Sequence, residues 1–170
     1  MSAKKKDSLA IALFSLLGAL MVGHAIYHYP LLPDRIAIHF GFSGAPDAWG
    51  SKTAFFFWYF VLTLIIVGGY ALIQRTFSQK NTSWISIPNK EYWLEPERAD
   101  ETLDYLRRSL LLLGSGTLLF VLDLIHQSFQ VSLGHASKLT HIWTSAAIYI
   151  ALCTAWIAGV YRRFASPPVS

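Results

Sequence analysis

Four long apolar runs, each about 20 residues, limit what this 170-residue chain can fold into. A helix needs about 20 apolar residues to cross a bilayer, and only helices or closed barrels satisfy their backbone groups in lipid. Charged residues make up 14% of the chain, against about 25% in soluble domains. We therefore predict an all-α integral membrane protein that forms a single membrane domain over residues 1–170. The predicted transmembrane helices are residues 8–28, 53–72, 109–130 and 142–161.

The first apolar run follows a short basic segment, which is also how a secretory signal peptide begins. The apolar core of a signal peptide is about 7–15 residues long, and residues 8–28 form a longer run. We therefore expect a retained transmembrane helix here.

The segment between the first two runs, residues 29–52, is too long for a plain connector. Connections between helices of a bundle usually need about 2–8 residues. This segment also contains many turn-forming residues, namely Pro33, Gly41, Gly44, Pro46 and Gly50. We predict that it folds on itself as a structured extracytoplasmic loop that lies over the ends of the helices.

The inner segment, residues 75–108, is polar and ends in an amphipathic stretch. Pro96 suits the first turn of a helix, where its missing N–H is no loss. Leu103, Leu106 and Leu110 then share one helix face at a spacing of three and four residues. We predict an amphipathic helix that continues into the third apolar run.

Basic residues are distributed unevenly over the predicted inner and outer segments. If both termini are cytoplasmic, the inner segments hold 11 of the 14 lysines and arginines. The outer segments hold the other three, Arg35, Lys52 and Lys138. Lysine and arginine next to membrane spans favour the cytoplasmic side, so we predict that both termini are cytoplasmic. The formal net charge of +4 then reflects insertion into a lipid bilayer, and we expect no nucleic-acid partner.

All six histidines lie on the predicted outer side or toward the outer ends of the spans. His24 and His28 are one helical turn apart on the same face, and His126 lies near the outer end of another helix. Imidazole is a common ligand of zinc and copper. A shared divalent-metal site at His24, His28 and His126 is therefore one interpretation. A hydrogen-bonded polar cluster, or separate histidines at the membrane interface, is the other.

Asp123 is an acidic residue inside the third apolar run. A charged acid at the centre of a spanning helix costs about 2.5–3.5 kcal/mol on insertion scales. We expect Asp123 to face the bundle interior and to accept a hydrogen bond from a histidine or from the folded outer loop. In the alternative, it lies shallow enough to reach water among the lipid headgroups.

The outer loop carries side chains that could contact a ligand or partner, namely His39, Phe40, Asp47, Trp49 and Lys52, and Asp123 of the third run is a further candidate contact. Asp47 and Lys52 could form an ion pair, and Trp49 could lie at the lipid boundary, where tryptophan is enriched. A purely structural cap over the bundle is the other interpretation of these residues.

Small residues recur every four positions in the last apolar run, at Ala147, Ala151, Ala155 and Gly159. A helix face of small residues lets another helix approach closely, so we predict helix packing there. Chance in an alanine-rich helix is the alternative. Cys153 is the single cysteine of the chain and excludes an internal disulfide bond.

The outer loop also carries a pattern that resembles a small bacterial membrane domain of unknown function. The matching residues are Leu32, Pro33, Ile36, Ile38, His39, Phe40, Gly44, Asp47, Trp49 and Lys52. That domain forms the N-terminal part of Sdp-type immunity proteins, which protect cells from a secreted killing peptide. A second stretch, residues 87–98, is similar to a segment that follows the domain in some relatives. Relatives often carry proline where this chain has Ala37, and the full immunity proteins continue with a further membrane portion not recognised here.

The resemblance implies a non-enzymatic protein of the bacterial inner (plasma) membrane. Such a protein would bind a peptide or a membrane partner through its outer face, in an immunity-like or signalling-like role. A second hypothesis is an accessory subunit of a larger membrane complex, docked through the small-residue face of the last run. A third is a metal-dependent membrane enzyme that uses the outer histidines, with a divalent metal as its cofactor. The sequence contains no recognisable catalytic motif, so we favour the non-enzymatic role and predict no catalytic residues.

Overall fold

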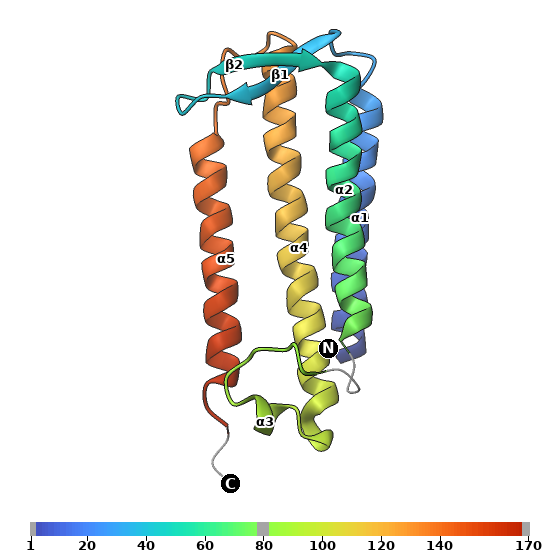
Figure 1. The fold of residues 1–170 in the computed structure, drawn as a ribbon, viewed down its shortest axis with the longest axis vertical. Coiled ribbons are helices and arrows are strands. Elements are labelled where there is room, and N and C mark those ends of the chain that lie inside the picture. The colour runs from blue at the N-terminus through green and yellow to red at the C-terminus, as the bar shows by residue number, and fades with distance from the viewer. Residues whose placement is uncertain (1–2, 78–81, 168–170) are drawn as a thin grey trace.

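Four long helices stand side by side, and a β-hairpin lies across one end of them (Figure 1). This is the arrangement in the computed structural model, which describes residues 3–77 and 82–167. The elements are α1 (Ala3–His28), β1 (Arg35–Phe40), β2 (Pro46–Ser51), α2 (Lys52–Thr76), α3 (Lys90–Trp93), α4 (Pro96–Ser132) and α5 (Ile142–Phe164). Among the described residues, four helices are long and apolar enough to cross a membrane, as predicted. We call the two ends of the bundle the hairpin end and the α3 end.

Helix α4 is the centre of the bundle and contacts α1, α2, α3, α5 and β1. In Figure 1 it stands between α5 and the pair formed by α1 and α2. Leu118 and Phe129 of α4 are fully buried against α1 and α2, in the largest apolar cluster of the structure. Because α4 is 37 residues long, it continues beyond the apolar run at the α3 end, where Leu103 and Leu106 pack in a second apolar cluster.

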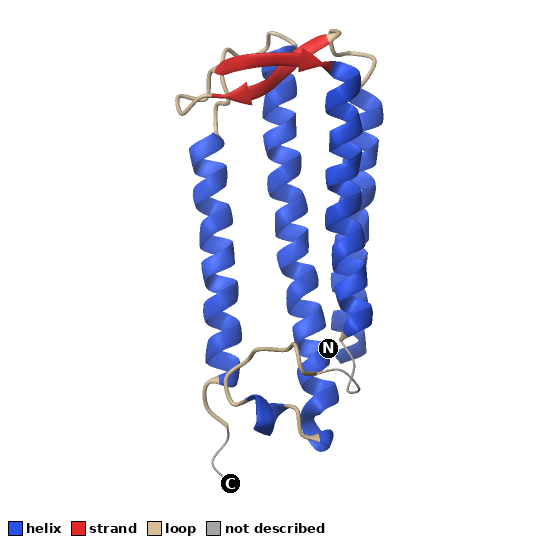
Figure 2. Ribbon diagram, viewed as in Figure 1, coloured by secondary structure: helices blue, strands red, loops and turns tan. Residues whose placement is uncertain are grey.

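The predicted outer loop contains a two-stranded antiparallel sheet, shown in red in Figure 2. The fold is therefore mostly helical but not all-α, because β1 and β2 pair from Arg35 with Ser51 to Phe40 with Pro46. The register is irregular on both sides of His39: β1 carries an extra residue before it and β2 carries one after it, as in β-bulges. The sequence did not predict these strands, because the second strand, residues 46–51, contains proline, glycine and aspartate, which are rare in strands.

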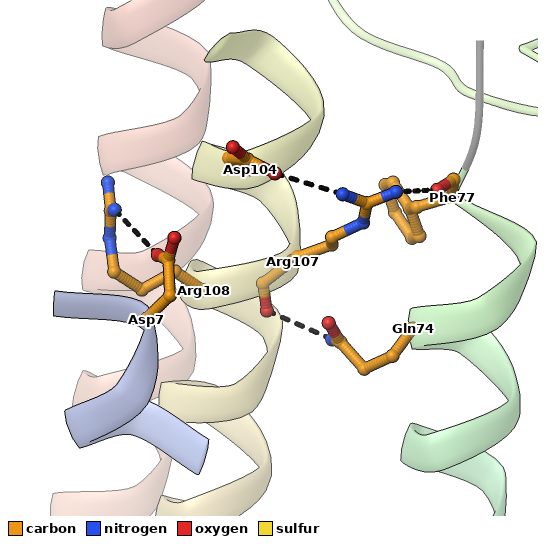
Figure 3. Close-up of polar contacts among 6 residues, drawn as sticks. All are labelled: Asp7, Gln74, Phe77, Asp104, Arg107 and Arg108. Atoms are coloured by element: carbon orange, nitrogen blue, oxygen red, sulfur yellow. Dashed lines mark hydrogen bonds and ion pairs between the residues drawn. The ribbon is translucent and has the colours of Figure 1, made fainter. Parts of the chain in front are cut away.

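Polar contacts of α4 tie it to α1 and α2 at the α3 end (Figure 3). The Arg107 guanidinium donates to the backbone oxygen of Phe77, which follows the last turn of α2. The Gln74 side-chain amide of α2 donates in return to the backbone oxygen of Arg107, at 3.0 Å. Arg108 points the other way and forms an ion pair with Asp7 of α1 at 3.0 Å. Charged residues at this end are therefore partly exposed to solvent and also connect the helices to one another.

The short α3 segment covers the end of α5. The Trp93 indole N–H donates to the backbone oxygen of Phe164 at 3.0 Å, and the Asn89 amide donates to the backbone oxygens of Phe164 and Ala165. The last carbonyl groups of a helix have no partner within the helix. Side chains from the inner segment satisfy them here, so this segment is part of the packed structure. Of the basic residues used for the predicted orientation, Lys80 and the side chains of Lys4, Lys5 and Lys6 lie outside the described part.

Candidate functional site

The hairpin is fixed to the central helix through the backbone of Ala37, which is fully buried. The N–H of Ala37 donates to the Ser132 hydroxyl at 3.0 Å, and the Ser128 hydroxyl donates to the Ala37 carbonyl oxygen at 3.0 Å. Ser132 in turn donates to the backbone oxygen of Ser128 at 2.8 Å. Both backbone groups of Ala37 are thereby paired with α4, so the hairpin has a defined position over the bundle.

Lys52 closes the base of the hairpin, with a side chain that is only 15% exposed. Its ammonium group donates to the backbone oxygen of Leu32 at 2.8 Å, and it lies 3.7 Å from a carboxylate oxygen of Asp34. It also lies 5.0 Å from the ring centre of Tyr29, within the range of a cation–π contact. The partner suggested by the sequence, Asp47, lies elsewhere. Asp47 is near the turn between the strands, whereas Lys52 follows the far end of β2, about five residues or 16 Å away.

Asp47 instead pairs with His39 across the hairpin, with 2.5 Å between the carboxylate oxygen and Nδ1. The two side chains are 51% and 70% exposed, respectively. Trp49 on the same strand is 42% exposed. Phe40 differs, because it packs against the buried cluster formed by Ala37, Val131 of α4 and Leu139 after α4. Three of the predicted contact residues, His39, Asp47 and Trp49, are therefore at the surface, while Phe40 is part of the hairpin's support.

Three histidines from two helices meet at the hairpin end. His24 and His28 of α1 and His126 of α4 each offer one ring nitrogen, and these nitrogens lie within 4.8 Å of one another. The closest pair is His24 Nε2 and His126 Nδ1, at 3.2 Å. Phe129 lies beside the cluster, with its ring centre 5.3 Å from that of His24 and 5.3 Å from that of His28. The structure thus brings together the three residues that the sequence proposed as metal ligands.

Asp123 joins α4 to α5. One of its carboxylate oxygens accepts hydrogen bonds from the Gln127 amide and the Ser145 hydroxyl, each at 2.7 Å. The Gln127 side-chain oxygen accepts the backbone N–H of His141, at the start of α5, at 2.9 Å. The carboxylate therefore accepts hydrogen bonds from a residue of its own helix and from one of α5, rather than from a histidine or the hairpin as the sequence had suggested. These contacts make Asp123 a structural link between two helices.

The small residues of α5 do not pack inside the described bundle. Ala147, Ala151, Ala155 and Gly159 are all exposed. The opposite face of α5 contacts α4, where the Tyr149 hydroxyl lies 2.9 Å from that of Thr117 and the Trp156 indole donates to a backbone oxygen. The predicted packing face therefore points away from α4 and is open to a second chain or to lipid.

Several residues that position these groups were missed by the sequence reasoning. Tyr59 contacts His24, Ser128 and Ser132 hold the hairpin, and Gln127 and Ser145 complete the Asp123 link. One signal could have found most of them. Polar side chains in apolar spans are rare and usually face a partner inside the bundle. Ser128 and Ser132 are also one turn apart, which places them on one helix face.

An apolar groove of about 940 Å³ runs between α1 and α2, with Leu111 of α4 at its floor. Gln74 and Arg75 line it near the α3 end. The groove is lined by other residues than the histidines, so it is separate from the cluster at the hairpin end.

A family model described as a domain of unknown function, DUF1648, matches residues 16–63. The match covers the second half of α1, the whole hairpin and the first half of α2. It contains His24 and His28 but not His126. No curated protein and no solved structure matches the chain. The part of the chain that the structure describes has four helices apolar enough to span a bilayer, so the chain is a membrane protein in which residues 16–63 are similar to this domain of unknown function.

Proposed function

We propose that this chain is a non-enzymatic protein of the bacterial inner membrane that binds a peptide or a membrane partner through its hairpin end. The observation that carries the proposal is the way the hairpin is held. Its backbone is fixed to α4 through Ala37, while His39, Asp47 and Trp49 remain exposed on it. A rigid support with exposed polar and aromatic groups is the usual form of a binding surface, because little ordering is needed on association.

Two further observations support this role. The matching family segment is centred on the hairpin, so the hairpin is part of a unit found in other proteins. Near the turn between the strands, Phe42 and Trp143 also lie exposed with ring centres 4.5 Å apart. Tyrosine, tryptophan and phenylalanine are enriched where proteins meet partners, so this aromatic pair extends the surface offered by Trp49.

The proposed orientation places the hairpin end outside the cytoplasm and both termini inside it. The described basic residues at the α3 end are Arg75, Lys90, Arg98, Arg107, Arg108, Arg162 and Arg163. Only Arg35, Lys52 and Lys138 lie at the hairpin end among the described residues. Cytoplasmic loops carry an excess of lysine and arginine, which supports this orientation. A secreted peptide would then meet the hairpin first, as an immunity-like role requires.

A survival assay tests the immunity form of the proposal. Sensitive bacteria that express the chain are exposed to an Sdp-type secreted killing peptide, and survivors are counted at matched membrane levels of each variant. We expect the wild type to protect, and Trp49→Ala and His39→Ala to protect less. Trp58→Ala is the matched control, because Trp58 is an exposed tryptophan on α2 and not part of the hairpin. Equal survival with and without the wild-type chain would exclude this role.

The exposed face of α5 supports a second candidate, an accessory subunit of a larger membrane complex. Of the four spanning helices, α5 has the smallest buried share, and a Cβ added at Gly159 would contact nothing in the described structure. We expect Ala151→Trp to release a partner subunit that co-purifies with the wild type in fixed ratio. Ile157→Trp, at an exposed position outside the small-residue face, should leave the ratio unchanged. Loss with both variants, or with neither, would contradict docking through this face.

A further inference from the structure

We propose that His24, His28 and His126 bind one divalent transition-metal ion, with Zn²⁺ as the expected ion, between α1 and α4 at the hairpin end. Their ring nitrogens lie within 4.8 Å of one another, although they come from helices far apart in the chain. A donor set of imidazoles alone suits zinc, copper or nickel, whereas magnesium and calcium prefer oxygen ligands. The site goes beyond partner binding and does not depend on it.

The closest nitrogen pair has the spacing that a zinc ion requires. Zn–N bonds are about 2.0–2.1 Å long, and tetrahedral geometry then separates two ligand nitrogens by about 3.3 Å. His24 Nε2 and His126 Nδ1 are 3.2 Å apart. The same spacing also suits a hydrogen bond between two imidazoles. The positions of the ring protons therefore decide which nitrogens have a lone pair that could bind a metal ion.

The hydrogen bonds of Tyr59 determine which nitrogen of His24 carries its proton. The Tyr59 hydroxyl donates to the backbone oxygen of Met21 at 2.9 Å, and a carbonyl oxygen can only accept. The hydroxyl oxygen must therefore accept the proton of His24 Nδ1, which lies 3.3 Å away. The lone pair of His24 is then on Nε2, the nitrogen that faces His126.

A backbone group likewise determines which ring nitrogen of His28 carries the proton. Its Nδ1 lies 2.9 Å from the backbone oxygen of His24, so this nitrogen carries the proton and donates it. The lone pair of His28 is therefore on Nε2. Metal-binding histidines usually donate their other N–H to a carbonyl, carboxylate or hydroxyl partner, which holds the ring in place. Both α1 histidines have this arrangement.

His126 completes the set from α4 and is exposed, which gives an ion access to the site. Metal binding at Nδ1 requires the ring proton to reside on Nε2. The Gln130 side-chain nitrogen lies 3.4 Å from His126 Nε2, and its oxygen lies 3.0 Å from His135 Nδ1. A half-turn of the amide would present its oxygen to His126 Nε2, and His135 Nδ1 would then accept from the amide N–H. Three protein nitrogens leave one position of a tetrahedral ion open, as in catalytic rather than structural zinc sites.

The surroundings of the site limit its movement. Phe129 is fully buried, and its ring stacks on that of His24 with only 5° between the planes. His28 is itself buried. An ion bound here would therefore meet ligands that are already ordered, with water reaching it from the His126 side.

Zinc binding by the purified chain tests the proposal. The protein is prepared in mild detergent with an affinity tag that contains no histidine, and Zn²⁺ alone is titrated while bound metal is counted by elemental analysis. We expect one Zn²⁺ per chain, no comparable binding of Mg²⁺, and a tetrahedral absorption spectrum when Co²⁺ replaces Zn²⁺. His126→Ala should lose this binding, and His141→Ala should keep it, because both are exposed histidines and only His126 is in the cluster.

A second variant, which keeps all three ligands, distinguishes a lost metal site from a protein that fails to fold. Tyr59→Phe removes the acceptor for His24 Nδ1–H but leaves all three ligands, so zinc affinity should fall about 10–100-fold. Zn²⁺ should raise the Tm of the wild type and of His141→Ala, and leave the Tm of His126→Ala unchanged. A wild type that binds no Zn²⁺, or a His126→Ala variant that binds it with wild-type affinity, would overturn the proposal.

Discussion

Ser132 of α4 accepts the backbone N–H of Ala37 at 3.0 Å, which attaches the hairpin to the central helix at a fully buried point. Proline at position 37 would have no N–H and could not form this bond. The Ser128 hydroxyl also donates to the Ala37 carbonyl oxygen at 3.0 Å, so two serines of α4 and both backbone groups of Ala37 make the attachment.

Replacing Ser132 with alanine should destabilise the folded protein by about 1–3 kcal/mol, because the buried N–H of Ala37 would lose its acceptor. Ser128→Ala should have a smaller effect, since a carbonyl without a partner is tolerated more easily than an N–H. Thermal unfolding in detergent measures both. Ser43→Ala, at an exposed position in the turn, is the control, and equal losses at Ser43 and Ser132 would contradict the proposed attachment.

Gly44→Ala should destabilise the protein more than Gly134→Ala. Both glycines have a positive φ, +81° and +77°, which costs an alanine about 1–2 kcal/mol. Only at Gly44 would the new Cβ also lie 2.9 Å from a backbone oxygen, that of Leu139. Leu139 donates its N–H to the Gly44 oxygen at 2.8 Å, so the turn and the α4–α5 loop cannot separate without losing this bond. Because both variants carry the cost of a positive φ, the difference between their Tm values measures the clash of the new Cβ with the Leu139 backbone oxygen.

The link between Asp123 and Ser145 should appear as a coupling energy in a double-mutant cycle. Single hydrogen bonds between helices in a bilayer contribute about 0.6 kcal/mol on average and up to about 1.7. We expect Asp123→Leu and Ser145→Ala each to weaken the fold, and the double variant to lose less than the sum of both. Asp123→Asn should reduce the folded yield less than Asp123→Leu, because its amide oxygen can still accept from Gln127 and Ser145. Additive single losses would show that the pair is not coupled.

Labelling of introduced cysteines should reveal the proposed orientation. In a Cys153→Ala background, Ser43→Cys lies in the exposed hairpin turn and Ser166→Cys lies beyond α5 at the α3 end. A membrane-impermeant maleimide should label Ser43→Cys in intact spheroplasts and should label Ser166→Cys only after lysis. The reverse pattern would place the hairpin in the cytoplasm and exclude contact with a secreted peptide.

The four candidate spans could be predicted from the sequence because hydropathy is a local property and a spanning helix needs no partner to satisfy its backbone. The hairpin could not. Its second strand, residues 46–51, has few strand-forming residues, and it exists because β1 pairs with it and α4 holds β1. A strand of this kind depends on tertiary contacts that no local pattern contains.

The histidine cluster, too, could be predicted from the sequence only in part. The spacing of His24 and His28 places both on one face of a helix, which the sequence alone determined. The addition of His126 depends on how α4 is rotated and shifted against α1, because a ring nitrogen must come within about 3 Å of another from a different helix. That rotation follows from side-chain packing around Phe129 and Leu118.

By itself, the sequence determined that this chain is built from four helices suited to a bilayer, since length and apolarity are sums over neighbouring residues. Only the tertiary structure decided the partners of the polar groups. Lys52 pairs with Asp34 rather than Asp47, and Asp123 binds Ser145 rather than a histidine. The physical reason is that a hydrogen bond or ion pair extends only about 3–4 Å, so its partner is decided by strand register and helix packing.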